Sequence, residues 1–299
     1  MIICPKCQTQ LIQMDKGYIC QNCHHIFSER EGVLQLISEA DNKEFFFQNK
    51  KFDILYHSEE KNFWFRVRNK IIGDTITQYL PRPSHILEVG CGTGYVSRYL
   101  KAIGYHVECA DLFLDALQFC KQRNAGYQYY QLNLMDTIFI QEFDAICAFD
   151  VLEHIDDDTI ALKHLHDALK PGGLLFITVP ADMRLWSDKD VSARHKRRYS
   201  VHELQTKLKL SGFNVIKKSY FMTFLYPVLL LSRKVSMRSR EKNAGESLNT
   251  VKKEEMNELQ PNRILNSIFF FIFLLEVPFI RLFSFPLGSS LLYVAVKEP

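Results

Sequence analysis

The chain has 299 residues, a formal net charge of +3 and a composition that is 47% hydrophobic and 24% charged, which is ordinary for a globular protein with one sizeable domain and a smaller one beside it. A net charge this small excludes any argument from charge alone for binding to nucleic acid or to an anionic membrane. The first residues lead directly into a cysteine pair without a signal-peptide pattern, so we expect a cytoplasmic protein whose thiols are reduced.

Two C-x-x-C knuckles dominate residues 1–37, which we expect to form a separate unit. Cys4 and Cys7 form the first knuckle, and Cys20 and Cys23 form the second. Each knuckle can present two thiolates to one ion, so the pair predicts a tetrahedral Zn²⁺ site in preference to redox-active dithiols. The neighbouring His24 or His25 leaves a Cys₃His variant open. So short a unit cannot bury a sufficient core, so the ion is expected to support folding and not catalysis.

The sequence around the second knuckle, YICQNCHHIFSEREGVLQLI (residues 18–37), resembles the zinc ribbons of the Trm112-like family. It also resembles the ribbon that precedes the catalytic domain in certain ribosomal RNA guanine methyltransferases. The resemblance implies a zinc ribbon and does not imply one particular function.

The charged and aromatic residues 38–80 are expected to form a linker with two helices that end before Pro81. An alternation of strands and helices follows, which predicts an α/β fold with a doubly wound, mostly parallel, Rossmann-like sheet of seven strands. We assign this domain to residues 81–220 and 289–299. Its first six strands are predicted at 85–89, 106–110, 127–131, 144–149, 174–179 and 213–220, and its helices at 94–103, 113–123, 157–170 and 200–211.

A glycine-rich loop follows the first of these strands and is the main candidate for a ligand site. Gly90, Gly92 and Gly94 stand at alternate positions, whereas a dinucleotide loop would carry its third glycine one residue later. Glu88 precedes the loop, where a phosphate would be poorly placed and a cationic ligand with an amino-acid part would fit better. Asp111, at the end of the next strand, can accept both hydroxyls of a ribose. It can also serve as the N-cap of the following helix.

Polar residues after the third and fourth strands extend this candidate site. Asn133 could recognise an adenine amino group, with Leu134 supplying a backbone N–H, or it could simply form a turn. The fourth strand runs into DVLEH, residues 150–154. The carboxyl ends of parallel strands meet at one edge of the sheet, which is where open α/β sheets bind ligands.

Taken together, these motifs resemble the class I S-adenosylmethionine-dependent methyltransferases of the type 11/12 kind. LEVGCGTG matches the first motif of that family, CADL the second acidic position, FDAICAFDVLEH the fourth strand, LKPGGLLFITVP the strand after the next helix, and LSGFNVI the penultimate strand. The resemblance implies S-adenosylmethionine as cofactor. The cofactor-binding residues that we expect are Glu88, Gly90, Cys91, Gly92, Gly94, Asp111, Leu112, Asn133, Leu134 and Asp150. The segment NFWFRVRNKII (62–72) resembles a helix that covers the cofactor in some of these enzymes, or it packs as an ordinary amphipathic helix.

A methyl acceptor that is a hydroxyl needs a base to take its proton, and histidine suits that role. His154 is our first candidate and His195, in RHKRRYS (194–200), is the second. His154 could instead bond backbone at a helix start. Arg197 or Arg198 could grip an anionic acceptor, unless this basic run is only a solvated loop. DVLEH also resembles a segment that binds a divalent metal in ubiquinone-pathway O-methyltransferases, with Asp150 and Glu153 as the matching positions.

Residues 221–288 interrupt the domain as a helical, apolar insertion. SIFFFIFLLEVPFI (267–280) is shorter than the roughly 20 apolar residues of a membrane span, so we expect a lid over the acceptor site, a helix lying in a membrane interface, or a dimer contact. Arg233, Lys234, Arg238 and Arg240 follow the first apolar run, which fits a helix that meets anionic headgroups. A lid and a membrane contact at the inner face both favour a lipophilic acceptor.

The sequence thus predicts a methyltransferase that acts on a small or lipid-linked acceptor, on oxygen. The first alternative is a ribosomal RNA base methyltransferase that uses the ribbon to grip RNA. The ribbon carries Asp15, Glu29 and Glu31 beside its lysines, which makes nucleic acid a weaker partner. The second alternative is a non-catalytic scaffold that binds cofactor.

Overall fold

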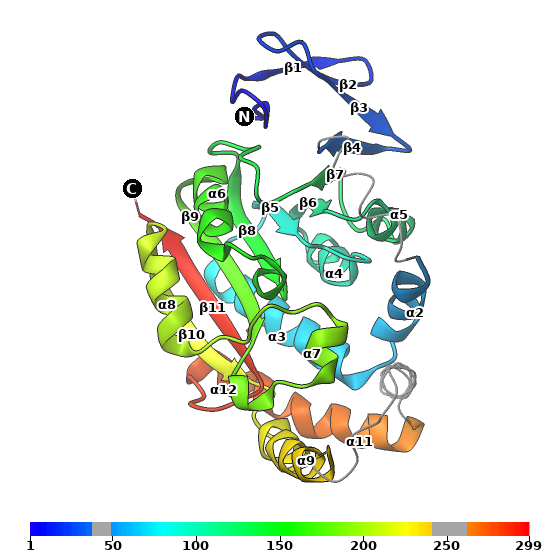
Figure 1. The fold of residues 1–299 in the computed structure, drawn as a ribbon, viewed down its shortest axis with the longest axis vertical. Coiled ribbons are helices and arrows are strands. Elements are labelled where there is room, and N and C mark those ends of the chain that lie inside the picture. Colours follow the sequence, from blue (N-terminus) through cyan, green and yellow to red (C-terminus); the bar gives the residue numbers. More distant parts are fainter. Residues whose placement is uncertain (38–48, 241–261, 299) are drawn as a thin grey trace.

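A mostly parallel sheet forms the centre of the molecule, as the sequence predicts (Figure 1). The computed structural model describes residues 1–37, 49–240 and 262–298. Seven strands of the sheet lie in the order β7-β6-β5-β8-β9-β11-β10, with β11 antiparallel between β9 and β10. The strands are β5 (His85–Val89), β6 (His106–Asp111), β7 (Gln128–Leu132), β8 (Phe143–Phe149), β9 (Leu169–Pro180), β10 (Phe213–Phe221) and β11 (Ser290–Lys297). This confirms a doubly wound α/β fold.

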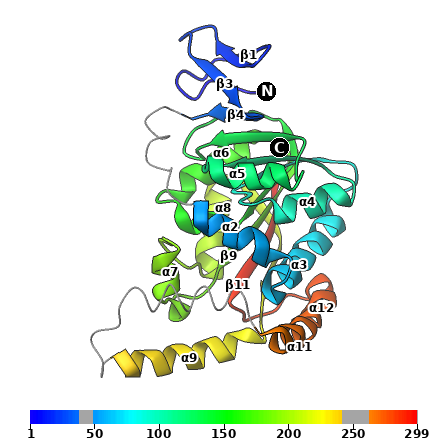
Figure 2. The same cartoon turned by 90° about the vertical axis from the view of Figure 1, so that its right-hand side faces the viewer.

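Helices cover both faces of the sheet, because successive strand residues point to opposite sides and both sides are apolar. On β5, Leu87 and Val89 belong to one buried cluster, whereas Ile86 belongs to the other. The first cluster includes α6 (Asp158–Ala168) and α8 (Val201–Leu210). The second includes α3 (Phe63–Tyr79), α4 (Tyr95–Ala102) and α5 (Leu114–Gln122). Figure 2 shows α3, α4 and α5 in front of the sheet. With both faces covered, the carboxyl edge of the parallel strands is the part left for ligands.

The sheet does not end at seven strands, which corrects the predicted strand number. The N-terminal strands β1 (Leu11–Met14), β2 (Gly17–Cys20), β3 (Ile26–Arg30) and β4 (Val33–Leu36) extend it to 11. β4 pairs in parallel with β7, where Leu34 faces Tyr130 and Leu36 faces Leu132. The apolar side chains of β4 are buried by this pairing, and β7 is no longer an edge. Residues 1–37 are therefore joined to the main sheet through backbone hydrogen bonds.

A second correction concerns the start of β9. The helix predicted to reach residue 170 ends at Ala168, and the strand begins at Leu169 instead of residue 174. Pro171, Gly172 and Gly173 lie inside this strand, where its register with β8 shifts. Gly172 adopts φ +74°, so the segment bulges without leaving the sheet.

Local capping defines both ends of α8. Ser200 Oγ accepts a hydrogen bond from the Glu203 N–H at 3.2 Å, and Gly212 follows the helix with φ +86°. Of the two helices predicted before Pro81, α2 (Asn49–Glu59) and α3 are present, whereas residues 38–48 lie outside the described part. Between β10 and β11 stand α9 (Leu225–Arg240), α11 (Arg263–Leu274) and α12 (Glu276–Leu282).

Two leucines on α8 give a matched test of how this fold is stabilised. Leu208 is fully buried, whereas Leu210 is 70% exposed. We expect Leu208→Ala to lower the free energy of unfolding by about 2–5 kcal/mol, because it leaves a cavity in the core. Leu210→Ala should change it by no more than about 0.5 kcal/mol. Urea unfolding followed by circular dichroism measures both, and equal losses would contradict this packing.

Candidate functional site

The glycine-rich loop lies at the carboxyl end of β5, and its conformation requires glycine. Gly92 and Gly94 adopt φ +54° and +79°, in the left-handed region. A Cβ on Gly94 would lie 2.6 Å from Cys120 Sγ and 2.7 Å from Ala125 Cβ, so this glycine lets α4 approach its neighbours. A Cβ on Gly92 would have no heavy atom within 4 Å. The backbone at Gly92 therefore borders open space that a ligand can enter.

Asp111 holds this loop in place from the end of β6. Its Oδ2 accepts a hydrogen bond from the Gly92 N–H at 2.9 Å, and its Oδ1 accepts one from the Phe113 N–H at 2.9 Å. Burial raises the pKa of Asp111 to about 6, although these backbone donors oppose the shift. The carboxylate is thus fixed beside the glycine loop, in the position from which we expect it to accept ribose hydroxyls.

Glu88 and Cys91 lie beneath the loop. The Glu88 carboxylate is buried and accepts a hydrogen bond from Ser97 Oγ on α4. Burial raises the pKa of Glu88 to about 8, so at neutral pH it does not present the full negative charge that the sequence interpretation assumed. The Cys91 N–H donates to the Ala110 carbonyl at 3.0 Å, which ties the loop to β6.

The remaining predicted cofactor residues stand around the same edge. The Leu112 carbonyl accepts a hydrogen bond from Gln131 Nε2 at 3.1 Å. Asn133 Oδ1 accepts one from the Met135 N–H at 3.0 Å, so Asn133 forms a turn. The Leu134 carbonyl lies 2.8 Å from His164 Nδ1. The hydrogen bond to Met135 supports the interpretation of Asn133 as a turn residue. A contact between Asn133 and adenine stays a prediction.

Asp150 connects this edge to α3. Its Oδ2 lies 2.7 Å from Arg68 Nη2, and its Oδ1 accepts a hydrogen bond from Thr178 Oγ1 at 3.2 Å. The backbone of Asp150 is left-handed, with φ +58°. Arg68 is 8% exposed and its guanidinium lies 5.4 Å from the Trp64 ring. The segment 62–72 thus contacts the site through Arg68, which lies on the buried face of α3.

A buried network that the sequence interpretation missed closes α2 over the glycine loop. Arg123 Nη1 pairs with the Glu59 carboxylate and donates to Thr93 Oγ1 at 2.8 Å. Thr93 belongs to the glycine loop, and it also donates to Glu59. Glu59 lies 64 residues before Arg123, and neither residue belongs to a recognisable motif, so no local pattern could have revealed the pair.

On the acceptor side, the structure brings both predicted histidines together. The rings of His154 and His195 meet edge to face at 4.8 Å between centroids. His154 belongs to a short 3-10 helix (Leu152–His154), and His195 follows α7 (Asp188–Ser192). His195 Nδ1 lies 2.9 Å from Asp190 Oδ1, and its Nε2 lies 4.0 Å from Glu153 Oε1. Asp190 was not predicted, although it stands five residues before His195.

Asp190 and Glu153 have opposite protonation behaviour. Burial alone would raise the pKa of Asp190, but His195 and Arg198 outweigh it and lower the pKa to about 2. Burial, with the nearby Asp150 carboxylate, raises the pKa of Glu153 well above its usual range. Asp190 is therefore ionised at neutral pH and orients His195, whereas burial favours the neutral form of Glu153.

The basic run RHKRRYS is engaged mainly with acids of this chain. Arg198 Nε lies 2.8 Å from Asp190 Oδ1, and Arg197 Nη1 lies 3.0 Å from Asp158 Oδ2. Lys196 Nζ lies 3.0 Å from an Asp156 carboxylate oxygen. Because both arginines already have carboxylate partners, the interpretation that they grip an anionic acceptor is not supported.

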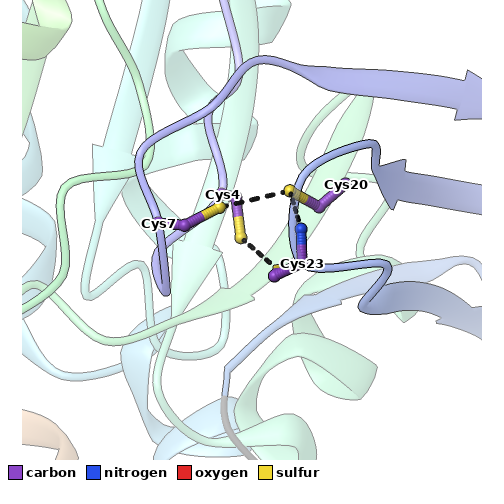
Figure 3. A group of neighbouring side chains, drawn as sticks. All are labelled: Cys4, Cys7, Cys20 and Cys23. Atoms are coloured by element: carbon purple, nitrogen blue, oxygen red, sulfur yellow. Dashed lines mark hydrogen bonds between the residues drawn. The ribbon is translucent and has the colours of Figure 1, made fainter.

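Among the described residues, four groups of side chains have ligand atoms close enough together to hold a metal ion, and two of them contain predicted site residues of the zinc unit or the acceptor side. The other two are Cys91, Cys109 and Cys120, and His85, His106 and Glu108. Cys4, Cys7, Cys20 and Cys23 point toward one another from two loops (Figure 3). Their sulfurs are 3.6 Å apart for Cys4 and Cys23 and 3.3 Å apart for Cys7 and Cys20. Tetrahedral zinc–sulfur bonds of about 2.3 Å imply sulfur separations of about 3.8 Å, so the set fits zinc. The group on the acceptor side comprises Glu153, His154 and His195, whose ligand atoms lie within 4.8 Å of one another.

Comparison with known proteins points in one direction. A methyltransferase domain family matches residues 56–218. Ubiquinone biosynthesis O-methyltransferase of Coxiella burnetii is 33% identical over 118 residues, which cover 38% of this chain and 49% of that protein. The chain therefore spans about half the length of the curated relatives that it matches.

Two solved structures share the fold. Phosphoethanolamine N-methyltransferase 2 of Haemonchus contortus, in complex with S-adenosyl-L-methionine, has a TM-score of 0.51 and 18% identity, and the match covers 78% of this chain and 52% of that one. A chain from the Haloferax volcanii complex between the Trm112 methyltransferase activator and a methyltransferase has a TM-score of 0.51 and 14% identity, with coverage of 78% and 91%.

The pKa of Asp111 gives a pH-dependent test of the cofactor site. Below a pH of about 6 the carboxyl is protonated and loses acceptor capacity, so affinity for S-adenosylmethionine should fall as the pH drops through this value. Asp111→Asn should weaken binding by about 10- to 100-fold at pH 7.5 and flatten the pH dependence, because one charge-assisted hydrogen bond contributes about 1.5–3 kcal/mol. Calorimetric titration measures this, with Asp115→Asn on α5 as the control. An unchanged affinity in Asp111→Asn would contradict the assignment.

Proposed function

Because this chain belongs to the methyltransferase domain family, we propose that it transfers a methyl group from S-adenosylmethionine to an oxygen atom of a small or lipid-linked acceptor. The observation that carries the choice of oxygen is the Asp190–His195 pair at the carboxyl edge of the sheet. The curated relatives, which are named ubiquinone biosynthesis O-methyltransferases, support an oxygen acceptor.

The residues at the edge of β5 and β6 fit this cofactor. Gly92 offers an open stretch of backbone, and Asp111 offers a fixed carboxylate beside it. Arg123, Glu59 and Thr93 hold α2 against the loop, so this side is closed to water by packed protein. When bound there, S-adenosylmethionine supplies a methyl group already activated by its sulfonium, and the chain needs mainly to align the acceptor.

His195 is the proposed base. Asp190 accepts the Nδ1–H of His195, which leaves the Nε2 lone pair facing Glu153 and His154. A hydroxyl placed at Nε2 would give its proton to this nitrogen while its oxygen forms the new bond to the methyl carbon and the carbon–sulfur bond breaks. Asp190 then stabilises the imidazolium, and Arg198 keeps Asp190 ionised. His154, edge to face with His195, is the second candidate for this proton.

The surroundings of His195 favour an apolar acceptor over RNA. Met183 is 55% exposed and Val191 is 60% exposed, on the two short helices that precede His195. Apolar side chains of this kind suit a lipophilic molecule, whereas RNA would require cations that are available for phosphate. Arg197 and Arg198 are already paired with acids. The RNA alternative also gains no support from the names of the curated relatives.

A labelling experiment tests this function. Purified protein and radiolabelled S-adenosylmethionine are added to an extract of the source cells, which is then separated into lipid, small-molecule, RNA and protein fractions. We expect label in the lipid or small-molecule fraction. His195→Gln should reduce the rate about 100-fold or more, because general base catalysis contributes about 10²–10⁴, without changing the affinity for S-adenosylmethionine.

The control variant is His202→Gln, which alters an exposed histidine on α8 and should keep full activity. Pretreatment with a chelator distinguishes a reaction that uses His195 as a base from one that needs a metal ion at Glu153, His154 and His195. Only the metal-dependent reaction would stop. Label in RNA would sink the proposal. Cofactor binding without transfer to any fraction would favour the scaffold.

We further propose that Cys4, Cys7, Cys20 and Cys23 bind one structural Zn²⁺. The sulfur geometry and the absence of a disulfide among these cysteines support it. Four protein ligands leave no position for substrate, so the ion acts on folding. It would fix the two loops at the ends of β1 and β2, and through them the strands that lead to β4.

Metal analysis tests this site. We expect one zinc ion per chain and its loss in Cys7→Ser, with faster amide exchange confined to β1, β2 and β3, because the ion supplies stability that this short unit lacks. Cys147→Ala, which removes a buried thiol from β8, should retain the zinc. A zinc-free protein with protected amides in these strands would refute the assignment.

A further inference from the structure

Exposed apolar side chains concentrate on one part of the molecule. Of the 25 large hydrophobic side chains that are exposed among the described residues, 14 lie between residues 224 and 287. Exposed apolar side chains of soluble proteins are usually scattered singly, so their concentration in this segment indicates an interaction surface. We call it the apolar end, and it comprises Phe224, Val228, Leu231, Ile264, Leu265, Ile268, Phe269, Phe271, Ile272, Leu275, Phe279, Leu282, Phe283 and Leu287.

The part of the apolar end on α11 and α12 is anchored by the opposite face of these helices. Phe273, Val277 and Ile280 are buried in a cluster with residues of α3, β10 and β11. Glu276 is fully buried, and its Oε1 accepts a hydrogen bond from the Phe224 N–H at 2.9 Å. A rotation of α11 and α12 that buried the outward side chains would expose Phe273, Val277 and Ile280. The outward side chains therefore stay exposed to solvent in this packing.

Charge around the apolar end has one sign. In the described side chains of α9, α11 and α12, the cations are Arg233, Arg263 and Arg281, and the single acid is the buried Glu276. Arg66 of α3 adds a guanidinium 3.9 Å from the Phe270 ring. An apolar face bordered by arginines complements a bilayer surface with anionic headgroups, where the side chains reach the acyl boundary and the cations meet phosphate.

From these observations we propose that α9, α11 and α12 dock the protein onto an anionic lipid bilayer, lying in its surface without crossing it. Residues 263–282 are long and apolar enough to span a membrane by length and composition. The sequence analysis considered only the shorter apolar run 267–280 and did not identify this length. A span would, however, have to pull Val277 and Ile280 out of the core and place Glu276 in hydrocarbon. Docking parallel to the surface keeps all three where they are.

The docked surface adjoins the proposed acceptor side. The Tyr226 hydroxyl of α9 donates a hydrogen bond to the Asp182 carboxylate, which also pairs with Arg184. Arg233 Nε donates to the Leu185 carbonyl at 3.3 Å. These residues belong to or flank the short helix (Met183–Leu185) that leads to α7 and His195. In both views α9 and α11 lie at the end of the molecule opposite β1 and β2 (Figures 1 and 2). If the proposed function holds, the acceptor enters from the lipid side; vesicle binding itself does not depend on that function.

Vesicle flotation with the full chain tests the docking. We expect the protein to float with vesicles of phosphatidylcholine and phosphatidylglycerol in equal parts, and at least tenfold less with phosphatidylcholine alone. Phe271→Ser combined with Leu275→Ser should weaken binding to mixed vesicles by at least tenfold. The double substitution removes two apolar side chains, 66% and 62% exposed, from the surface that would enter the bilayer. The matched control is Leu210→Ser with Ile216→Ser, which alters exposed side chains elsewhere and should float like the parent.

Three readouts decide the outcome. Circular dichroism and affinity for S-adenosylmethionine should be unchanged in both double variants, which separates lost docking from lost folding or a failed cofactor site. Release of the bound protein by alkaline carbonate supports surface docking, whereas retention would overturn it in favour of a span. Absence of flotation, with a dimer in solution that Phe271→Ser dissociates, would show that a second copy covers the apolar end.

Discussion

The structure depends on a parallel sheet whose strands are apolar on both faces. Such strands are stable only between two layers of helices, and in this chain α6 and α8 provide one layer while α3, α4 and α5 provide the other. Once both faces are closed, chemistry is confined to the carboxyl edge. Asp111, Asp150 and the glycine loop meet there because each lies at the end of a strand or directly after it. The fold thus determines where the site can be before any side chain determines what it does.

Around this edge, buried charges are used to join elements that are distant in sequence. Arg68 brings α3 to Asp150, Arg123 brings α2 to the glycine loop, and Arg198 brings the loop after α7 to Asp190. Each guanidinium has a carboxylate partner, so the cost of burying the charge is offset by pairing. Glu153 is different, since both of its carboxyl oxygens are buried without a hydrogen-bond partner. It is therefore the carboxyl group at this edge best placed to receive a cation.

How much of this could be predicted from the sequence depends on how local each signal is. The signals for β5, β6, β7 and β8 are local, and the sequence predicts each of these strands to within one residue at either end. The Gly-Cys-Gly loop and Asp111 stand next to each other because adjacent strands pair in register. By contrast, the contacts of Asp190 and of Glu59 depend on how loops and helices pack, which no spacing encodes. The start of β9 at Leu169 was missed because Pro171 and Gly172 are also typical helix terminators.

The pairing of β4 with β7 also bears on the order in which the protein folds. Gln35 and Gln131, which lie side by side in that pair, are 96 residues apart in the chain. The N-terminal strands leave the ribosome first, yet their partner strand is made only after β5 and β6. Contacts of such long sequence separation form slowly, since the loop that they close is costly in entropy. We therefore expect the N-terminal unit to dock last, with its strand edge open until the central strands have assembled.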